Sequence, residues 1–277
     1  MAPTDRAPAL GLIGGAGVLP ALMAREAQEA GWRVVVFALA EPAALPSVVD
    51  RVILFRLGDV GPLLDTLQSE GIRHLVLAGG VRKDGLFQGM PLDGVARALL
   101  DQAPDWTDES LLRTASAALE SMGIELLDQR RFLGPWLAPA GHLAGPVVDA
   151  GLLADARRGL EAARALGRLS IGQTVVVKAG AVVAVEAMEG TDETIRRGLA
   201  LAGPGASVVK APAPGHDYRF DVPTVGPDTV ARCAAGQARI LAVEAKRVLL
   251  LDRDTVATEA SRAGLTVIGL GETAGDR

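Results

Sequence analysis

The chain has 277 residues, of which 49% are hydrophobic, and it carries a formal net charge of −5. This length favours two domains of ordinary size over one large core. Acidic and basic residues are spread along the chain without a basic stripe, which argues against nucleic acid as a partner. No apolar run reaches the roughly eighteen residues of a transmembrane span, and residues 1–8 are polar and too short for a signal peptide. We therefore expect a cytoplasmic protein.

The sequence contains one cysteine, Cys233, so an internal disulfide and a cysteine metal cage are excluded. Its setting in "TVARCAAG" predicts a small buried residue on a helix, without a chemical role. Three histidines, His74, His142 and His216, show no metal-ligand spacing. A Mg²⁺ site made of carboxylates therefore suits this sequence better than a zinc site.

Strands and helices alternate in the first half of the chain. The spacing of apolar residues predicts strands at 9–15, 32–39, 51–57, 74–80 and 124–129, and helices at 19–30, 62–70, 91–102 and 108–122. This alternation favours a parallel sheet covered by helices, so residues 1–131 are predicted to form a Rossmann-like domain. Ligands of such a sheet bind at the carboxyl ends of its strands.

Residues 132–151 hold three prolines and four glycines without helical or strand periodicity, which predicts a linker. The remainder, 152–277, is predicted to be a second α/β domain with a mixed sheet. Two β-rich runs around Ala179-Gly180 indicate a hairpin. The other predicted elements are helices at 152–167, from about 191 to 201 and at 228–236, and strands at 206–210, 239–243, 247–251 and 265–270.

Two stretches of the first domain could contact an anionic ligand. "GGAGVLP", with Gly14, Gly15 and Gly17, follows a strand and opens a helix, where backbone N–H groups can bind phosphate. A tight turn explains these glycines equally well, and the dinucleotide fingerprint is incomplete because Pro20 occupies its last glycine position. In "AGGVRK", Arg82 and Lys83 follow a strand end and are either ligand-binding or solvated surface charges.

In the second domain, "EAMEGTDE" places acidic residues at the start of a helix. Asp192 and Glu193 are explained by the helix dipole, with Thr191 available as a cap. Glu186 and Glu189 have no such explanation and are candidates for a functional role.

The stretch "KAPAPGHDYRFDVPTVG", residues 210–226, is the strongest candidate site. Asp217, Arg219 and Asp221 alternate as they would on one face of an extended strand, and the prolines restrict the backbone. Rigid backbone with ionic groups on one side suits a preorganised site. The alternative is a structural Asp–Arg pair on a surface loop.

Several stretches together resemble the LpxI-type UDP-2,3-diacylglucosamine pyrophosphatases of lipid A synthesis. They follow in the family's order over nearly the whole chain: "GLIGGAGVLP", "AGGVRK", "LGRLSIGQTVVVKAGAVVAVEAMEGTDETIRR", "VVKAPAPGHDYRFDVPTVG" and "RVLLLDR". The match departs from the pattern at Ala213 and His216, where many members carry lysine and glutamine.

The resemblance implies a cytoplasmic, Mg²⁺-dependent hydrolase, with peripheral contact to the inner membrane and a homodimeric state. Its reaction would split UDP-2,3-diacylglucosamine into UMP and 2,3-diacylglucosamine 1-phosphate, with water attacking the sugar-side phosphorus. The family's critical aspartate falls on Asp221. Pyrophosphate hydrolysis also requires cations at the phosphates, for which Lys210 and Arg219 are the candidates.

The remaining expected roles concern metal and substrate binding. The expected metal-binding carboxylates are Asp221, Asp217 and Glu189. The expected substrate-binding residues are Gly14, Gly15, Gly17, Gly80, Arg82, Lys83, Thr191 and Thr224. Two other functions stay open from the residues themselves: a non-catalytic protein that binds nucleotide sugars or lipids, and a nicotinamide-dependent dehydrogenase.

Overall fold

The structure of the chain, a computed structural model, describes residues 7–39, 49–81 and 89–271. The chain divides into two compact units. Unit 1 comprises Met1–Leu133 and Asp217–Asp221, and unit 2 comprises Gly134–His216 and Val222–Arg277. The sequence-based domain assignment places residues 217–221 in the C-terminal domain, whereas their contacts place them in unit 1.

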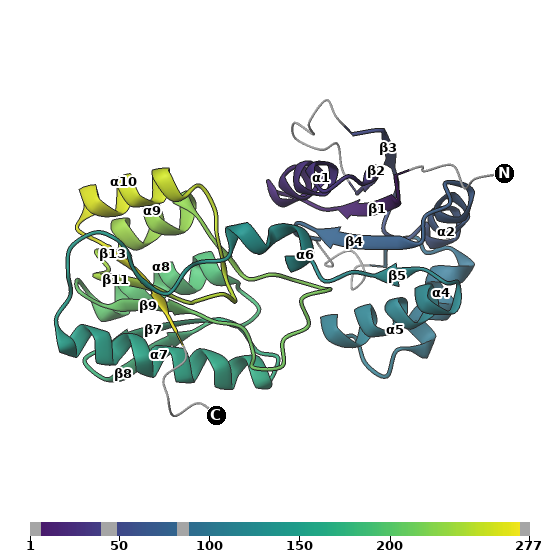
Figure 1. Ribbon diagram of the computed structural model, residues 1–277. Coiled ribbons are helices and arrows are strands. Elements are labelled where there is room, and N and C mark those ends of the chain that lie inside the picture. The colour runs from purple at the N-terminus through teal and green to yellow at the C-terminus, as the bar shows by residue number, and fades with distance from the viewer. Residues whose placement is uncertain (1–6, 40–48, 82–88, 272–277) are drawn as a thin grey trace. The chain divides into compact units, whose positions relative to one another are not determined.

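Unit 1 is built on a five-stranded parallel sheet with the order β3-β2-β1-β4-β5 (Figure 1). Its strands are β1 (Ala9–Gly14), β2 (Arg33–Ala38), β3 (Arg51–Leu54), β4 (His74–Ala78) and β5 (Glu125–Leu126). The chain runs outward from β1 to β3 and returns to β4 on the other side of β1. A parallel sheet has a ligand-binding crevice where its strand order reverses in this way. The expected Rossmann-like sheet is confirmed.

Helices cover both faces of this sheet. They are α1 (Leu19–Glu29), α2 (Val60–Ser69), α4 (Gly94–Gln102), α5 (Asp108–Ser121) and α6 (Arg130–Leu133). On one face, Leu67 of α2 and Leu119 of α5 join a buried cluster with Phe37 and Leu75. Helix α1 lies on the other face, since a Cβ added to Gly14 would meet Pro20, while one added to Gly11 would meet Leu75 and Leu67.

Unit 2 is built on a six-stranded mixed sheet with the order β6-β13-β11-β9-β7-β8. The strands are β6 (Gly141–Ala144), β7 (Thr174–Lys178), β8 (Ala181–Val185), β9 (Ser207–Lys210), β11 (Ile240–Glu244) and β13 (Thr266–Leu270). β9, β11 and β13 are parallel, whereas β6, β7 and β8 each pair antiparallel with a neighbour. A separate pair consists of β10 (Thr224–Val225) and β12 (Leu249–Leu250). The expected mixed sheet is confirmed.

The helices of unit 2 also lie on both faces of their sheet (Figure 1). They are α7 (Ala150–Arg168), α8 (Thr191–Ala202), α9 (Pro227–Ala235) and α10 (Arg253–Ala263), with a 3₁₀ turn at Gly134–Trp136. α7 packs against alternate residues of the sheet such as Val175, Val209 and Ala242. The other three helices cover the opposite residues, among them Val176 and Leu241. Successive strand residues therefore point to opposite faces of the sheet, and each face is covered by its own helices.

Helix α10 and the 132–151 stretch are among the regions that differ from the sequence-based expectation. Helix α10 was not predicted, because only Val256 and Ala260 are buried along it. The 132–151 stretch expected as a linker contains β6, which pairs with β13. Glycine makes that pairing possible, since a Cβ on Gly145 would lie 1.9 Å from the carbonyl oxygen of Leu265. Among the described residues, no helix has both the length and the apolar character needed to cross a bilayer.

Candidate active site

Two glycine turns meet at the carboxyl ends of β1 and β4, where the strand order of unit 1 reverses. Ala16 and Gly80 form an antiparallel bridge, with Ala16 N donating to Gly80 O at 2.8 Å and Gly80 N donating to Ala16 O at 3.0 Å. A Cβ on Gly15 would lie only 2.3 Å from Gly80 O. Gly17 has a φ of 93°, a left-handed conformation that favours glycine. Backbone contact and conformation therefore account for Gly15 and Gly17.

The four glycines expected to bind substrate, Gly14, Gly15, Gly17 and Gly80, thus lie together at this edge of the sheet, which we call the glycine edge. A Cβ on Gly80 would meet nothing within 4 Å in the described structure, so close packing does not explain this glycine. Arg82 and Lys83 lie outside the described residues.

The Asp217–Asp221 segment is a turn and not the extended strand that its alternating charges predict. Arg219 N donates to Asp217 Oδ1 at 3.1 Å, and Phe220 N donates to Asp217 O at 3.2 Å. Asp217 thus closes an Asx-type turn, in which an aspartate side chain accepts from the backbone two residues later. The prediction of an extended conformation is wrong because this local hydrogen bond competes with it.

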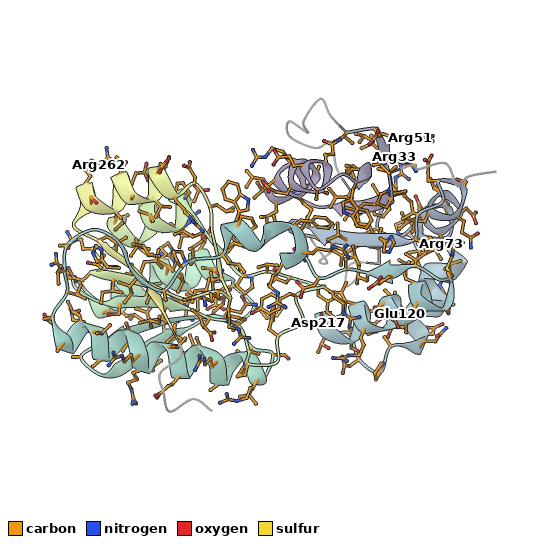
Figure 2. The ribbon with its side chains drawn as sticks, viewed as in Figure 1. Arg33, Arg51, Arg73, Glu120, Asp217 and Arg262 are labelled. Atoms are coloured by element: carbon orange, nitrogen blue, oxygen red, sulfur yellow. The ribbon has the colours of Figure 1, made fainter. Side chains whose placement is uncertain are left out.

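Within the turn, the guanidinium of Arg219 holds the Asp217 carboxylate through both of its oxygens. Arg219 Nε lies 3.0 Å from Oδ1 and Nη2 lies 2.7 Å from Oδ2. These hydrogen bonds from Arg219 lower the pKa of Asp217. A further ion pair of 3.4 Å joins Arg219 to Glu120 on α5. Figure 2 labels Asp217 and Glu120. The side chains of Asp217 and Arg219 therefore form the structural pair that was the alternative reading of this loop.

The rest of the segment is fixed to unit 1 by packing. The Arg130 guanidinium lies 3.7 Å from the centre of the Tyr218 ring, and Gln129 N donates to Tyr218 O at 3.1 Å. Phe220 packs against the core cluster of unit 1. Asp221, which ends the segment, is exposed. The flanking residues thus anchor the turn and leave the Asp221 side chain at the surface.

In unit 2, Lys210 at the end of β9 joins a chain of polar contacts at the start of α8. Lys210 Nζ donates to Thr191 Oγ1 at 3.0 Å, and this hydroxyl donates to Glu186 Oε1 at 2.9 Å. The N-cap residue of α8 is Gly190, so the expected capping role of Thr191 is wrong. The Thr191 hydroxyl instead connects the ammonium group of Lys210 to the carboxylate of Glu186.

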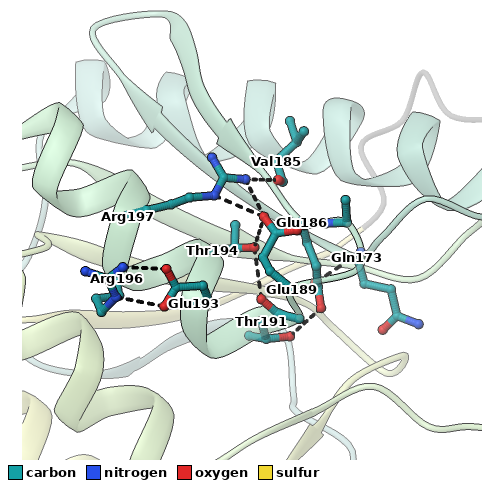
Figure 3. Close-up of polar contacts among 11 residues, drawn as sticks. Gln173, Val185, Glu186, Glu189, Thr191, Glu193, Thr194, Arg196 and Arg197 are labelled. Atoms are coloured by element: carbon teal, nitrogen blue, oxygen red, sulfur yellow. Dashed lines mark hydrogen bonds and ion pairs between the residues drawn. The ribbon is translucent and has the colours of Figure 1, made fainter. Parts of the chain in front are cut away.

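Glu189 belongs to a second network beside this one (Figure 3). Its Oε1 accepts from Arg197 Nε at 3.0 Å and from Thr194 Oγ1 at 3.2 Å. Arg197 also donates to the carbonyl of Val185 at 2.6 Å. The hydrogen bond from Arg197 lowers the pKa of Glu189. Glu189 is thus engaged in fixing the loop between β8 and α8.

The expected metal ligands are therefore not assembled as a protein cage. Asp217 is held by Arg219, and Glu189 by Arg197. Within the part of the chain that the structure describes, no three His, Cys, Asp or Glu side chains form a group that could hold a metal ion. Mg²⁺ commonly takes only one or two carboxylates together with substrate phosphates.

Two further expected residues are placed by the structure. The Thr224 hydroxyl in β10 donates to Val222 O at 2.8 Å, next to the Asp217–Asp221 segment in sequence. Cys233 is fully buried on α9, as predicted, and burial raises the pKa of its thiol to about 12.

Sequence reasoning did not identify Arg197 and Arg130, which hold these segments in place. Arg197 lies on α8, eight residues after Glu189, which precedes the helix. This spacing matches no sequence pattern that predicts an ion pair. Arg130 contacts the ring of Tyr218, which is distant in the sequence. Only the "DQRR" charge cluster marks Arg130 in the sequence, and such clusters are common on surfaces.

The chain matches known proteins over nearly its full length. Residues 9–136 match the family model described as the LpxI N-terminal domain, and residues 139–268 match the LpxI C-terminal domain. A curated relative, the UDP-2,3-diacylglucosamine pyrophosphatase LpxI of Caulobacter vibrioides, is 36% identical over 275 residues, which cover 94% of this chain and 97% of the relative.

Two solved structures show a distant likeness to this chain. An L-threonine dehydrogenase from Cupriavidus necator is 18% identical, with 51% of this chain and 43% of that chain covered and a TM-score of 0.29. An N5-carboxyaminoimidazole ribonucleotide synthetase from Thermotoga maritima is 16% identical, with coverages of 66% and 42% and a TM-score of 0.24. The chain spans less than half of either protein, and these similarities carry no functional argument. The two domain matches and the full-length relative show that the chain belongs to the LpxI family.

Proposed function

We propose that the chain hydrolyses the pyrophosphate of UDP-2,3-diacylglucosamine and releases UMP and 2,3-diacylglucosamine 1-phosphate. The observation that carries the proposal is the 36% identity to a pyrophosphatase of that name across 94% of this chain and 97% of the relative. Both LpxI domains are matched in this chain, so the similarity is not limited to a single domain that could serve for binding alone.

The chemistry of the described residues supports this reaction. A substrate pyrophosphate carries two negative charges, which repel an attacking water unless cations lie near them. Lys210 supplies one such cation, and its contact with Thr191 orients the ammonium group at the end of β9. The guanidinium of Arg219 supplies a second, partly neutralised by Asp217.

We assign the central role to Asp221. Its carboxylate is exposed at the end of an anchored turn, where it can accept a proton from water or hold a metal ion. Mg²⁺ bound by Asp221 together with the substrate phosphates would neutralise the charge that develops on the phosphate oxygens. In the bond change, the water oxygen bonds to the sugar-side phosphorus and the bridging oxygen leaves with UMP.

The experiment is hydrolysis of UDP-2,3-diacylglucosamine in ¹⁸O-water by the purified protein, with and without Mg²⁺. We expect UMP and a sugar 1-phosphate that carries the label. Tight binding without products would support the non-catalytic alternative, and label in UMP would overturn the proposed site of attack.

The same proposal covers location and assembly. The family resemblance implies a cytoplasmic homodimer. Because the substrate carries two acyl chains, we propose that this dimer meets the inner membrane peripherally. Sedimentation with vesicles that contain the substrate tests the membrane contact, and light scattering in solution tests the dimer. A monomer that remains with the supernatant would contradict both parts.

A further inference from the structure

A buried carboxylate in unit 2 lies outside the residues discussed so far. Glu244 ends β11, the strand between β13 and β9, and its side chain is 3% exposed. Alternation along β11 puts Glu244 on the same face as Ile240 and Ala242, which is the face covered by α7. A charged group so deeply buried requires compensating partners.

Two arginines supply that compensation at one oxygen. Glu244 Oε1 accepts from Arg164 Nη2 at 2.8 Å and from Arg247 Nη1 at 3.0 Å. Arg164 lies on α7, and Arg247 lies in the turn that follows β11. Glu244 Oε2 is also buried and accepts no hydrogen bond from the described residues. The carboxylate is thus held between a helix and a turn through Oε1.

The second guanidinium nitrogen of Arg247 reaches a different segment. Arg247 Nη2 donates to Ala213 O and, at 3.0 Å, to Pro214 O. The same stretch lies against the end of α7, because a Cβ on Gly167 would be 2.7 Å from Ala213 N. His216 N closes the turn by donating to Ala213 O at 3.1 Å.

The segment so held, residues 211–216, connects two residues of the proposed site. Lys210 precedes it at the end of β9, and Asp217 follows it. Ala211 N donates to Gln173 O at 2.9 Å, whereas Pro212 and Pro214 cannot donate backbone hydrogen bonds, so beyond Ala211 the carbonyls contribute to the attachment of the segment. Arg247 is the side chain that binds two of those carbonyls at once.

We propose that Glu244 and Arg247 are positioning residues for the hydrolysis. Glu244 orients the guanidinium of Arg247, and this guanidinium fixes the path of residues 211–216 and thereby the backbone that carries Lys210. The activity part of this inference rests on the proposed function, whereas its structural part can be measured without substrate.

The first test is hydrogen exchange of the full chain, followed by mass spectrometry, in an Arg247→Met variant. We expect faster exchange in the peptide that covers residues 211–217, by roughly tenfold, because the His216 amide loses the held carbonyl that it bonds to. The matched control is Arg239→Met. Arg239 donates to the carbonyl of Gly264 at 3.3 Å at the opposite end of β11, and its loss should leave the 211–217 peptide unchanged.

The second test is steady-state kinetics at a temperature where each variant is fully folded. Since misplacement of a site group costs mainly turnover, Arg247→Met should lower kcat by about tenfold or more and change KM by less than about threefold. Arg247→Lys keeps the charge and a donor but not the planar fork, so it should be intermediate in both exchange and kcat. Arg239→Met should turn over at the wild-type rate.

Each outcome bears on the inference. Wild-type exchange in Arg247→Met shows that Arg247 does not hold the segment, and faster exchange with unchanged kcat shows that the segment does not position the site. Either result overturns the proposal. If Arg247→Met does not fold, Arg247→Lys and Glu244→Gln are judged by the same two measurements. An inactive wild-type protein would overturn the proposed function and the positioning role with it, while the exchange result would still decide the contact.

Discussion

The guanidinium of Arg219 donates hydrogen bonds to both carboxylate oxygens of Asp217, which lies two residues earlier in the same turn. The pair lies at the surface of unit 1, with exposed side-chain fractions of 27% for Asp217 and 32% for Arg219. Exposed pairs contribute about 0 to 1 kcal/mol, because solvent screens the charges. The relationship therefore predicts a small, pH-dependent stabilisation.

Asp217→Asn should lower the stability of unit 1 by up to about 1 kcal/mol at neutral pH. The folded pKa of Asp217 is lowered, so its contribution is complete above the unfolded value near 3.9 and is lost as the pH falls through the folded value. The difference between wild type and variant should thus shrink below about pH 5. Urea unfolding in a Trp136→Phe background measures it, since Trp32 and Trp106 then report unit 1.

Glu120→Gln is the matched control for that experiment. Glu120 meets the same guanidinium at 3.4 Å but is 57% exposed, so its removal should cost less than Asp217→Asn. An Asp217→Asn variant with a pH-independent deficit would show that the ionised pair is not the source of the effect.

Gly15→Ala and Gly80→Ala separate packing from ligand contact at the glycine edge. A methyl group on Gly15 would lie 2.3 Å from Gly80 O, and relief of such overpacking typically costs about 1 to 3 kcal/mol. A methyl group on Gly80 would meet none of the described residues within 4 Å, so the stability of Gly80→Ala should stay within about 0.5 kcal/mol of wild type. Urea unfolding gives both values, and a loss of kcat/KM in stable Gly80→Ala would support ligand approach there. Equal stabilities would contradict the packing explanation.

Most of the fold follows from sequence because its elements are locally consistent. β-branched runs such as "TVVVK" and "AVVAV" flank Ala179-Gly180, and they form the hairpin β7–β8. Alternating strands and helices of unit 1 required a parallel sheet, which the structure has. Helix α10 escaped prediction since burial of Val256 and Ala260 alone gives almost no periodic signal.

The candidate site was less predictable, because its geometry depends on distant partners. The residue types around Asp217 pointed to an ionic loop, but the Asx-type turn replaced the expected strand. Nothing local shows that Glu189 pairs with Arg197, or that Arg247 reaches Ala213 from 34 positions away. Contacts of this kind come from the fold and not from the surrounding sequence pattern.

Asp155→Ala should destabilise unit 2. Asp155 is 8% exposed, and its carboxylate accepts from Ala179 N at 2.9 Å and Gly180 N at 2.6 Å, so it holds the turn of the β7–β8 hairpin. Without the carboxylate, the backbone amides of Ala179 and Gly180 lose their acceptor. Each hydrogen bond to a charged group contributes about 1.5 to 3 kcal/mol to stability. Urea unfolding in a Trp32→Phe, Trp106→Phe background follows unit 2 through Trp136.

The control for Asp155 is Asp149→Ala. Asp149 is exposed and caps α7 through one hydrogen bond of 2.9 Å to Leu152 N, a loss of about 0.5 to 2 kcal/mol. If Asp155→Ala costs no more than Asp149→Ala, the buried carboxylate does not hold the hairpin.

Metal removal should abolish activity and leave the fold intact. No protein cage is present among the described residues, so we expect Mg²⁺ to bind mainly with substrate and to contribute little to folding. EDTA should stop hydrolysis, added Mg²⁺ or Mn²⁺ should restore it, and the melting temperature without substrate should not change. Full turnover after exhaustive chelation would refute the metal requirement, and a lower melting temperature would indicate a resident structural ion.

Asp221→Asn should reduce kcat by about a hundredfold or more without loss of stability. A carboxylate that accepts a proton or holds a metal acts mainly in the transition state, so turnover falls while substrate still binds. The exposed position of Asp221 makes a large stability effect unexpected. Asp217→Asn is the matched control, because Asp217 lies in the same segment and is paired with Arg219.

The measurement joins kinetics with thermal unfolding of the same preparations. If Asp221 is catalytic, its variant separates from Asp217→Asn in kcat by at least about tenfold at equal melting temperature. A near-normal kcat for Asp221→Asn, or a loss no greater than its loss of folded protein, would remove Asp221 from the site. Because Asp217 and Glu189 are already engaged by arginines, a larger effect at either would mean that substrate breaks those pairs on binding.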